Sequence, residues 1–183
     1  MTASGQIAII LEDPIWKQRG IDPARIRAAA KLALRLGTEQ SNASRSPPPP
    51  ALPRLRATYR ANEAKREGKV PQLTILLTDD ERLRELNARF RGKNVATNVL
   101  SFPAAQTGRY LGDVAIAFGV AERETATAGV SLEAHTLHLA VHGVLHLLGY
   151  DHVRAHEACT MERLETAILS KFGAPNPRAG TAR

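Results

Sequence analysis

Histidine is the residue type whose distribution most directly suggests chemistry in this sequence. All six histidines lie between positions 135 and 156, in a stretch whose other residues are largely apolar from 132 to 148. A neutral imidazole is a common metal ligand, and a buried helix that carries polar side chains needs partners for them. The clustering therefore indicates a shared site on one predicted helix.

Helical spacing selects the histidines that can meet at one ion. His142 and His146 are four residues apart, so their side chains point the same way and lie about 6 Å apart along the axis. His138 lies about 12 Å from His146, too far for all three to reach one ion at about 2 Å. Gly149 can end the helix in a left-handed turn, which brings His152 back toward the pair.

The predicted ligands are His142, His146 and His152, in the pattern H-x-x-x-H-x-x-G-x-x-H. Three imidazoles leave one tetrahedral position of a zinc ion open to water or substrate, which is the arrangement of catalytic zinc. Structural zinc sites are usually closed and rich in cysteine, and Cys159 is the only cysteine. We therefore expect one zinc ion per chain.

The other histidines receive different predictions. His135 and His156 are expected not to be ligands. His138 is expected to be buried and hydrogen-bonded close to the ligands, where it can support one of them.

The same histidine spacing occurs in the metzincin peptidases, in which a glutamate directly follows the first histidine and acts as general base. This sequence has Gly143 at that position. A zinc peptidase, or another zinc hydrolase, is therefore a second interpretation. A ribosome-assembly binding protein whose metal only supports the fold is a third.

Two stretches resemble the YbeY family of metal-dependent endoribonucleases that mature ribosomal RNA. The segment from His142 to His152 matches the family signature H-G-x-L-H-L-x-G-Y-D-H. Residues 86–103 resemble a second family signature, which includes a loop that commonly reads Lys-Asp-Lys-Pro-Thr-Asp/Asn. In the second stretch Asn94, Val95 and Ala96 stand where the family commonly has Asp-Lys-Pro. The resemblance is densest over residues 73–165.

The resemblance implies hydrolysis of phosphodiester bonds in single-stranded RNA, at the 3′ end of 16S ribosomal RNA, and a role in ribosome quality control. It implies partners in precursor ribosomal RNA, the small ribosomal subunit and its assembly factors, with neither DNA nor a membrane. Arg91 would hold a phosphoryl oxygen, because a guanidinium can donate two hydrogen bonds at once. Asp151 is either a general base or a residue that fixes the turn before His152, and we favour the turn.

Composition agrees with these expectations. The formal net charge of +7 favours a polyanionic partner, although charge alone does not separate RNA from DNA or an anionic membrane. No apolar run approaches membrane-spanning length, and no signal peptide is recognised. We expect a cytoplasmic protein, and a single cysteine fits that reducing compartment.

The predicted fold is α+β: a single small domain in which a mixed sheet of about four strands packs against helices, with a buried central helix that carries the histidines. Strands are predicted at residues 7–11, 73–77, 99–102 and 114–117. One helix is predicted to have Asp22 as its N-cap and Pro23 in its first turn and to end before Gly37, and another to begin with a capping box from Thr78 to Glu81. Ser131 is predicted to cap the histidine helix.

Residues 1–37 and 70–172 are predicted to form this catalytic metal-hydrolase domain. Four consecutive prolines at positions 47–50 cannot support a helix or a strand ladder, and a basic stretch follows them. Residues 38–69 are therefore predicted to be a Pro-rich and then basic insertion. Residues 173–183 are predicted to be a disordered tail.

Overall fold

A four-stranded mixed sheet forms the centre of the computed structural model, which describes residues 7–44, 72–104 and 110–175. Strands β1 (Ile7–Leu11), β2 (Leu73–Thr78) and β4 (Gly112–Ala117) are parallel, and β3 (Val99–Pro103) is antiparallel to β4. The strand order is β1-β2-β4-β3. All six residues of β2 are buried, as expected for an inner strand that is covered on both faces. The predicted α+β fold is confirmed.

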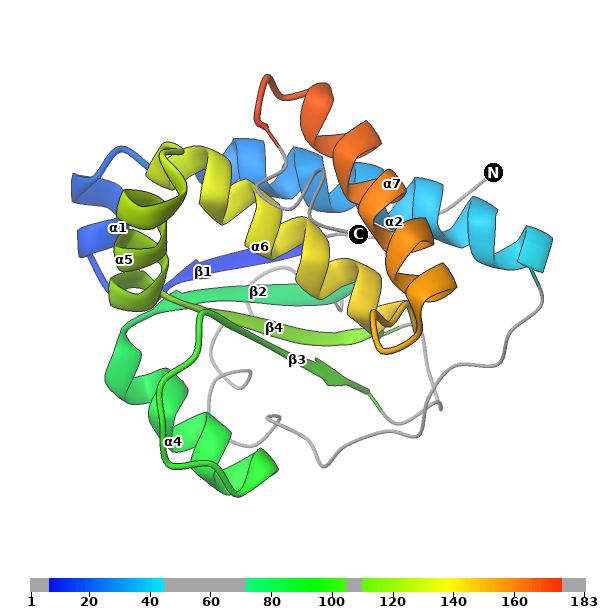
Figure 1. The fold of residues 1–183 in the computed structure, drawn as a ribbon. Coiled ribbons are helices and arrows are strands. Elements are labelled where there is room, and N and C mark those ends of the chain that lie inside the picture. Colours follow the sequence, from blue (N-terminus) through cyan, green and yellow to red (C-terminus); the bar gives the residue numbers. More distant parts are fainter. Residues whose placement is uncertain (1–6, 45–71, 105–109, 176–183) are drawn as a thin grey trace.

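Six helices lie within the described residues. They are α1 (Ile15–Gln18), α2 (Pro23–Ser44), α4 (Asp80–Arg91), α5 (Phe118–Ala128), α6 (Leu132–Leu147) and α7 (Ala155–Ser170). Helices α2 and α6 cover one face of the sheet, α7 packs on these two helices, and α4 packs on the other face of the sheet (Figure 1). Side chains alternate between the faces, so Ile75 and Leu77 join the α6 side while Leu76 joins the α4 side. Helix α6 is the central helix of its layer.

Helix α6 approaches the sheet closely at Gly143. A Cβ atom at this position would lie 2.5 Å from Val114 Cγ1 and 3.2 Å from the Ser101 hydroxyl oxygen. Ser101 donates a hydrogen bond to the Gly143 carbonyl oxygen at 3.1 Å. The glycine therefore lets the helix that carries the histidines lie directly on β3 and β4.

Replacing Gly143 by alanine is expected to lower the free energy of unfolding by about 1–3 kcal/mol, because the added methyl group overpacks a stiff β-branched neighbour. The intrinsic helix preference for alanine, about 1 kcal/mol, offsets part of this loss. Urea unfolding of the metal-free protein measures the change. Adding Val114→Ala to the Gly143→Ala variant should recover part of the lost stability. A single variant as stable as the wild type would contradict the predicted clash.

The prediction that a helix ends before Gly37 is wrong. Helix α2 begins at Pro23 as predicted, with the Asp22 carboxylate accepting from Ala24 N–H at 2.8 Å, but it continues to Ser44. A Cβ atom at position 37 would lie 2.5 Å from Leu148 Cδ1, and Tyr150 donates its hydroxyl hydrogen to the Gly37 carbonyl at 2.7 Å. This glycine allows a close helix contact rather than a helix stop.

The predicted capping box from Thr78 to Glu81 is wrong, because Thr78 is not the N-cap of α4. Thr78 is the last residue of β2, and its carbonyl accepts a hydrogen bond from the Trp16 indole at 3.0 Å. Asp79 caps α4 instead, accepting from Arg82 N–H at 2.7 Å. Because the strand needs Thr78 in an extended conformation, the capping role passes to the next residue.

The segments predicted as an insertion and a tail are only partly described. Residues 38–44 belong to α2, and residues 45–69 lie outside the described part of the chain. At the other end, Ala174 is 7% exposed and packs on the main core, which places it in the fold rather than in a disordered tail. Residues 176–183 lie outside the described part.

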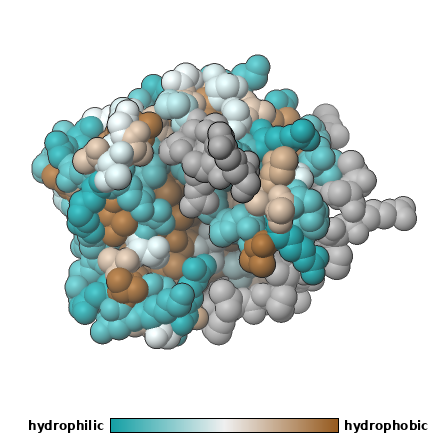
Figure 2. Space-filling view, in the orientation of Figure 1, coloured by the Kyte–Doolittle hydropathy of each residue, from teal (hydrophilic) through white to brown (hydrophobic). Residues whose placement is uncertain are grey.

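The surface seen in Figure 2 is mostly hydrophilic, with hydrophobic side chains in separate patches. Val95 and Val153 are the large hydrophobic residues described as exposed, at 57% and 80%. Among the described residues, no helix has the length and apolar character needed to cross a membrane.

Candidate metal centre

Helix α6 holds its histidines rigidly because nearly the whole helix is buried. Ser131 caps it as predicted, accepting a hydrogen bond from Ala134 N–H at 3.1 Å. Thirteen of its sixteen residues are buried, and three of these are histidines. The buried histidines are His135, His138 and His142. Burial in a packed core restricts each ring to one orientation.

His142 and His146 come together as their spacing predicts. Their Nε2 atoms are 3.1 Å apart, and their ring centroids are separated by 4.5 Å. Two nitrogen ligands on one tetrahedral zinc ion at about 2.0–2.1 Å lie about 3.3 Å from each other. The observed separation therefore suits two ligands of a single ion.

His152 joins the pair through the turn after α6. The helix ends at Leu147, and Gly149 adopts a φ of 91°, which a glycine takes without strain. The centroid of the His152 ring lies 5.5 Å from that of His142 and 5.2 Å from that of His146. Each of the three rings offers a nitrogen, and these nitrogens all lie within 4.8 Å of one another. The predicted trio can therefore hold a metal ion.

The electrostatic environment keeps His146 in the form that binds metals. Burial is the largest cause that lowers the pKa of His146, and together with the neighbouring His142 and His152 it brings the value to about 4, against a raising effect from Asp151. The ring is therefore neutral at neutral pH. A neutral imidazole has the free lone pair that a metal requires. The donor set and the neutral form of His146 both fit a zinc ion.

Glu165 of α7 is a buried carboxylate that the sequence analysis did not identify. It is 2% exposed, and its Oε1 lies 2.7 Å from His142 Nδ1. Its Oε2 lies 3.4 Å from His138 Nε2. Burial raises the pKa of Glu165, but the interactions with His138 and His142 outweigh it and lower the pKa to about 2. Glu165 is therefore ionised beside a predicted ligand.

A sequence signal for Glu165 did exist. The residue lies four positions after Met161 and three before Ile168, both of which are buried on the apolar face of α7. A single acidic side chain on an apolar face needs a polar or charged partner, and the histidines of the neighbouring helix could provide one. His138 is buried beside the ligands as predicted, at 3% exposed, but the predicted hydrogen bond is wrong, because neither of its ring nitrogens has a hydrogen-bond partner among the described residues.

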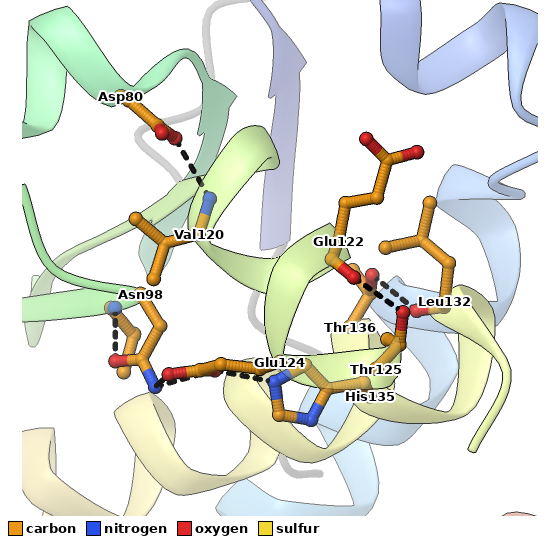
Figure 3. Close-up of polar contacts among 10 residues, drawn as sticks. Asp80, Asn98, Val120, Glu122, Glu124, Thr125, Leu132, His135 and Thr136 are labelled. Carbon is orange, nitrogen blue, oxygen red and sulfur yellow. Dashed lines mark hydrogen bonds and ion pairs between the residues drawn. The ribbon is translucent and has the colours of Figure 1, made fainter. Parts of the chain in front are cut away.

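His135 belongs to a different contact network, as Figure 3 shows. Its Nε2 lies 2.7 Å from Glu124 of α5, whose carboxylate also accepts from the Asn98 amide at 3.0 Å. Asn98 in turn accepts a hydrogen bond from Val99 N–H at 2.7 Å. This network joins the start of β3 to the first turns of α6. His156 is mostly exposed, with 76% of its side-chain surface accessible, and lies in neither metal-binding group of the described residues.

The two other predicted site residues occupy different surroundings. Asp151 is exposed, and its carboxylate accepts a hydrogen bond from the next residue, His152 N–H, at 2.7 Å, so its role as a turn-fixing residue stays a prediction. Arg91 is exposed in the last turn of α4, and no hydrogen bond or ion pair joins it to another described residue. It is thus not held against the histidines.

The end of α4 nevertheless lies at the same end of the sheet as the histidine trio. Phe90 packs on Phe102, with ring centroids 5.1 Å apart, and Phe102 pairs with Asp113 of β4. The adjoining Gly112 lies against Leu147 in the last turn of α6. The ends of α4 and α6 therefore lie at the same end of the sheet, on opposite faces. Strand β3 is the edge strand on this side of the sheet.

Comparison with known families gives one clear match. The family model described as Endoribonuclease YbeY matches residues 54–173 of this chain. The match includes the three predicted ligands and Arg91, and it begins inside the segment predicted as an insertion.

Individual relatives give the same result. A protein of Rhodopseudomonas palustris described as Endoribonuclease YbeY is 51% identical over 119 residues, which cover 61% of this chain and 63% of the relative. A protein of Agrobacterium fabrum with the same description is 50% identical over 119 residues, which cover 61% of this chain and 71% of the relative. A solution structure from Thermotoga maritima matches with a TM-score of 0.51 at 19% identity, covering 92% of both chains. This last likeness concerns the fold alone.

Proposed function

Because the chain belongs to the YbeY endoribonuclease family, we propose that it is a metal-dependent endoribonuclease that cleaves single-stranded RNA during ribosomal RNA maturation. The proposed cut lies at the 3′ end of 16S ribosomal RNA, with a further role in ribosome quality control. The proposed partners are precursor ribosomal RNA, the small ribosomal subunit and its assembly factors, in the cytoplasm. The net charge of +7 supports a polyanionic substrate.

The observation that carries the proposal is the convergence of three imidazole nitrogens at the end of α6. His142 is buried, His146 is partly exposed and His152 is exposed, so the group opens to solvent on the His152 side. Three neutral ligands leave one coordination position for a substrate or water. We assign His142, His146 and His152 as the ligands of one zinc ion.

The chemistry divides between the ion and the chain. A zinc ion held there would polarise a phosphoryl oxygen and increase the acidity of water, which suits hydrolysis of a phosphodiester. His142 and His146 orient the site because the buried helix α6 fixes both rings. Asp151 fixes the turn that presents His152. Arg91 is proposed to donate two hydrogen bonds to a nonbridging phosphoryl oxygen as negative charge develops.

The peptidase alternative meets a specific obstacle in this fold. The glutamate base of metzincin peptidases would stand at position 143, and that position faces Val114 and Ser101 of the sheet. Because a glutamate side chain would point into these residues rather than toward the histidine trio, it could not act there as a general base. The third interpretation, a binding protein with a structural metal, predicts a site without catalytic turnover.

One experiment tests the three interpretations together. Purified protein is incubated with a single-stranded RNA and, separately, with casein, each with and without a chelator. We expect cleavage of RNA only, lost on chelation and restored by zinc. His142→Ala protein purified in parallel controls for contaminating ribonuclease, because a contaminant would cleave equally in both preparations. Casein cleavage would support the peptidase, and metal binding without RNA cleavage would support the binding protein.

A further inference from the structure

Glu165 contacts the ring nitrogen of His142 that faces away from the predicted metal position. Its Oε1 is 2.7 Å from Nδ1, whereas Nε2 of the same ring lies 3.1 Å from His146 Nε2. The 2.7 Å separation is that of a hydrogen bond in which the carboxylate oxygen accepts, so Nδ1 of His142 carries the hydrogen. Nε2 then presents its lone pair toward His146. This is the tautomer that a metal between the histidines requires.

We propose that Glu165 is a positioning residue that fixes the tautomer and orientation of His142 for metal binding, while the His138 ring lies beside its second carboxylate oxygen, at 3.4 Å from Nε2 to Oε2. The proposal rests on the proposed function, because it presumes a metal at the histidine trio. It adds a residue from α7 to a site that α6 and the following turn otherwise build.

Burial and partners support this role. Glu165 is 2% exposed on the otherwise apolar face of α7, where an apolar side chain would pack without the cost of desolvating a charge. Among the described residues, its hydrogen-bond and ion-pair partners are His138 and His142. A carboxylate that orients a histidine ligand in this way also makes the ring a stronger base and a better ligand.

A second metal ion is the competing explanation. His138, His142 and Glu165 also form a group whose donor atoms lie within 4.8 Å of one another. However, the 2.7 Å between His142 Nδ1 and Glu165 Oε1 is the length of a charge-assisted hydrogen bond, and two ligands of one tetrahedral ion lie about 3.3 Å apart. The geometry therefore favours a hydrogen atom between these two atoms.

Two substitutions of similar volume separate charge from hydrogen bonding. Glu165→Gln keeps an oxygen that can accept from His142, and Glu165→Leu removes every acceptor. The measurements are zinc affinity, by competition with a chromophoric chelator, and zinc stoichiometry. Long-range proton–nitrogen NMR spectra of the metal-free protein report which nitrogen of His142 carries the hydrogen. We expect the dissociation constant to rise about 10–100-fold in Glu165→Leu and less in Glu165→Gln.

Two control variants are needed. One tests whether lower stability alone weakens zinc binding, and the other tests whether loss of a different Glu–His contact does so. Met161→Ala opens a cavity in the same buried face of α7, so it lowers stability without removing a hydrogen bond to a histidine. Glu124→Gln weakens the other Glu–His contact on α6, at His135. Both variants should bind zinc as tightly as the wild type, within about twofold, once thermal unfolding shows that the metal-free proteins are folded.

The outcomes are distinct. Loss of affinity in Glu165→Leu, with His142 shifted toward the Nε2–H tautomer and one ion still bound per chain, supports the proposal. Unchanged affinity and tautomer in Glu165→Leu would overturn it while leaving the metal site intact. Two ions in the wild type and one in the variant would make Glu165 a ligand and also overturn it. A wild type that binds no zinc would overturn both this inference and the proposed function.

Discussion

His146→Ala protein is expected to lose its zinc ion and to cleave RNA at least about a thousandfold more slowly than the wild type. His146 supplies one of three proposed ligands, and Lewis-acid stabilisation of a phosphoryl transition state contributes several kcal/mol. The substitution removes a side chain at a partly exposed position near the end of α6, so the fold should survive. Elemental analysis and single-turnover cleavage of a short RNA measure the two effects on one preparation.

His138→Gln is the matched comparison for that experiment, because His138 lies on the same helix but outside the trio. It should retain one zinc ion per chain, with a smaller loss of affinity through the carboxylate of Glu165. The opposite result, full zinc in His146→Ala and none in His138→Gln, would show that the ligand assignment is incorrect. Circular dichroism of each variant establishes that the helices remain.

Arg91→Lys is expected to slow the chemical step by roughly a hundredfold to a thousandfold, or about 2–4 kcal/mol, with little change in RNA affinity. Lysine keeps the positive charge but cannot donate two parallel hydrogen bonds to a phosphoryl group. An interaction made mainly as charge develops in the transition state affects the rate more than ground-state binding. Single-turnover cleavage and RNA affinity are therefore measured together, with zinc content.

Arg89→Lys provides the control for Arg91, because Arg89 is exposed in the same last turn of α4. It should leave the cleavage rate within a factor of about three. If Arg91→Lys cleaves at the wild-type rate, Arg91 is not a clamp. If only its affinity changes, Arg91 is a phosphate contact on a basic surface.

Short sequence patterns predicted the strands and the histidine trio, because these features depend on residues that are close in the sequence. The four strands follow from short β-prone runs, and the His142–His146 pair follows from the four-residue helical repeat. The position of His152 depended on one glycine, Gly149, whose conformation reverses the chain within three residues. Each of these features involves residues close in the sequence.

The features that were missed depend on distant contacts. Gly37 reads as a helix stop until Leu148 and Tyr150 are seen to pack on it from more than a hundred residues away. Glu165 lies on an apolar face of α7, but its partner His142 is 23 positions earlier in the chain, so the sequence does not show which residue it contacts. A single sequence shows which residue types are present, but packing between helices and strands determines which contacts these residues make.

The unequal burial of the three proposed ligands has a kinetic consequence. His142 is fixed within a packed helix, whereas His152 lies exposed on the turn between α6 and α7. Exposed turns open locally on far shorter timescales than core helices unfold. We therefore expect the metal ion to dissociate after His152 detaches from it. A stiffer turn between α6 and α7 would then slow dissociation of the ion, with a smaller effect on the rate at which the ion binds.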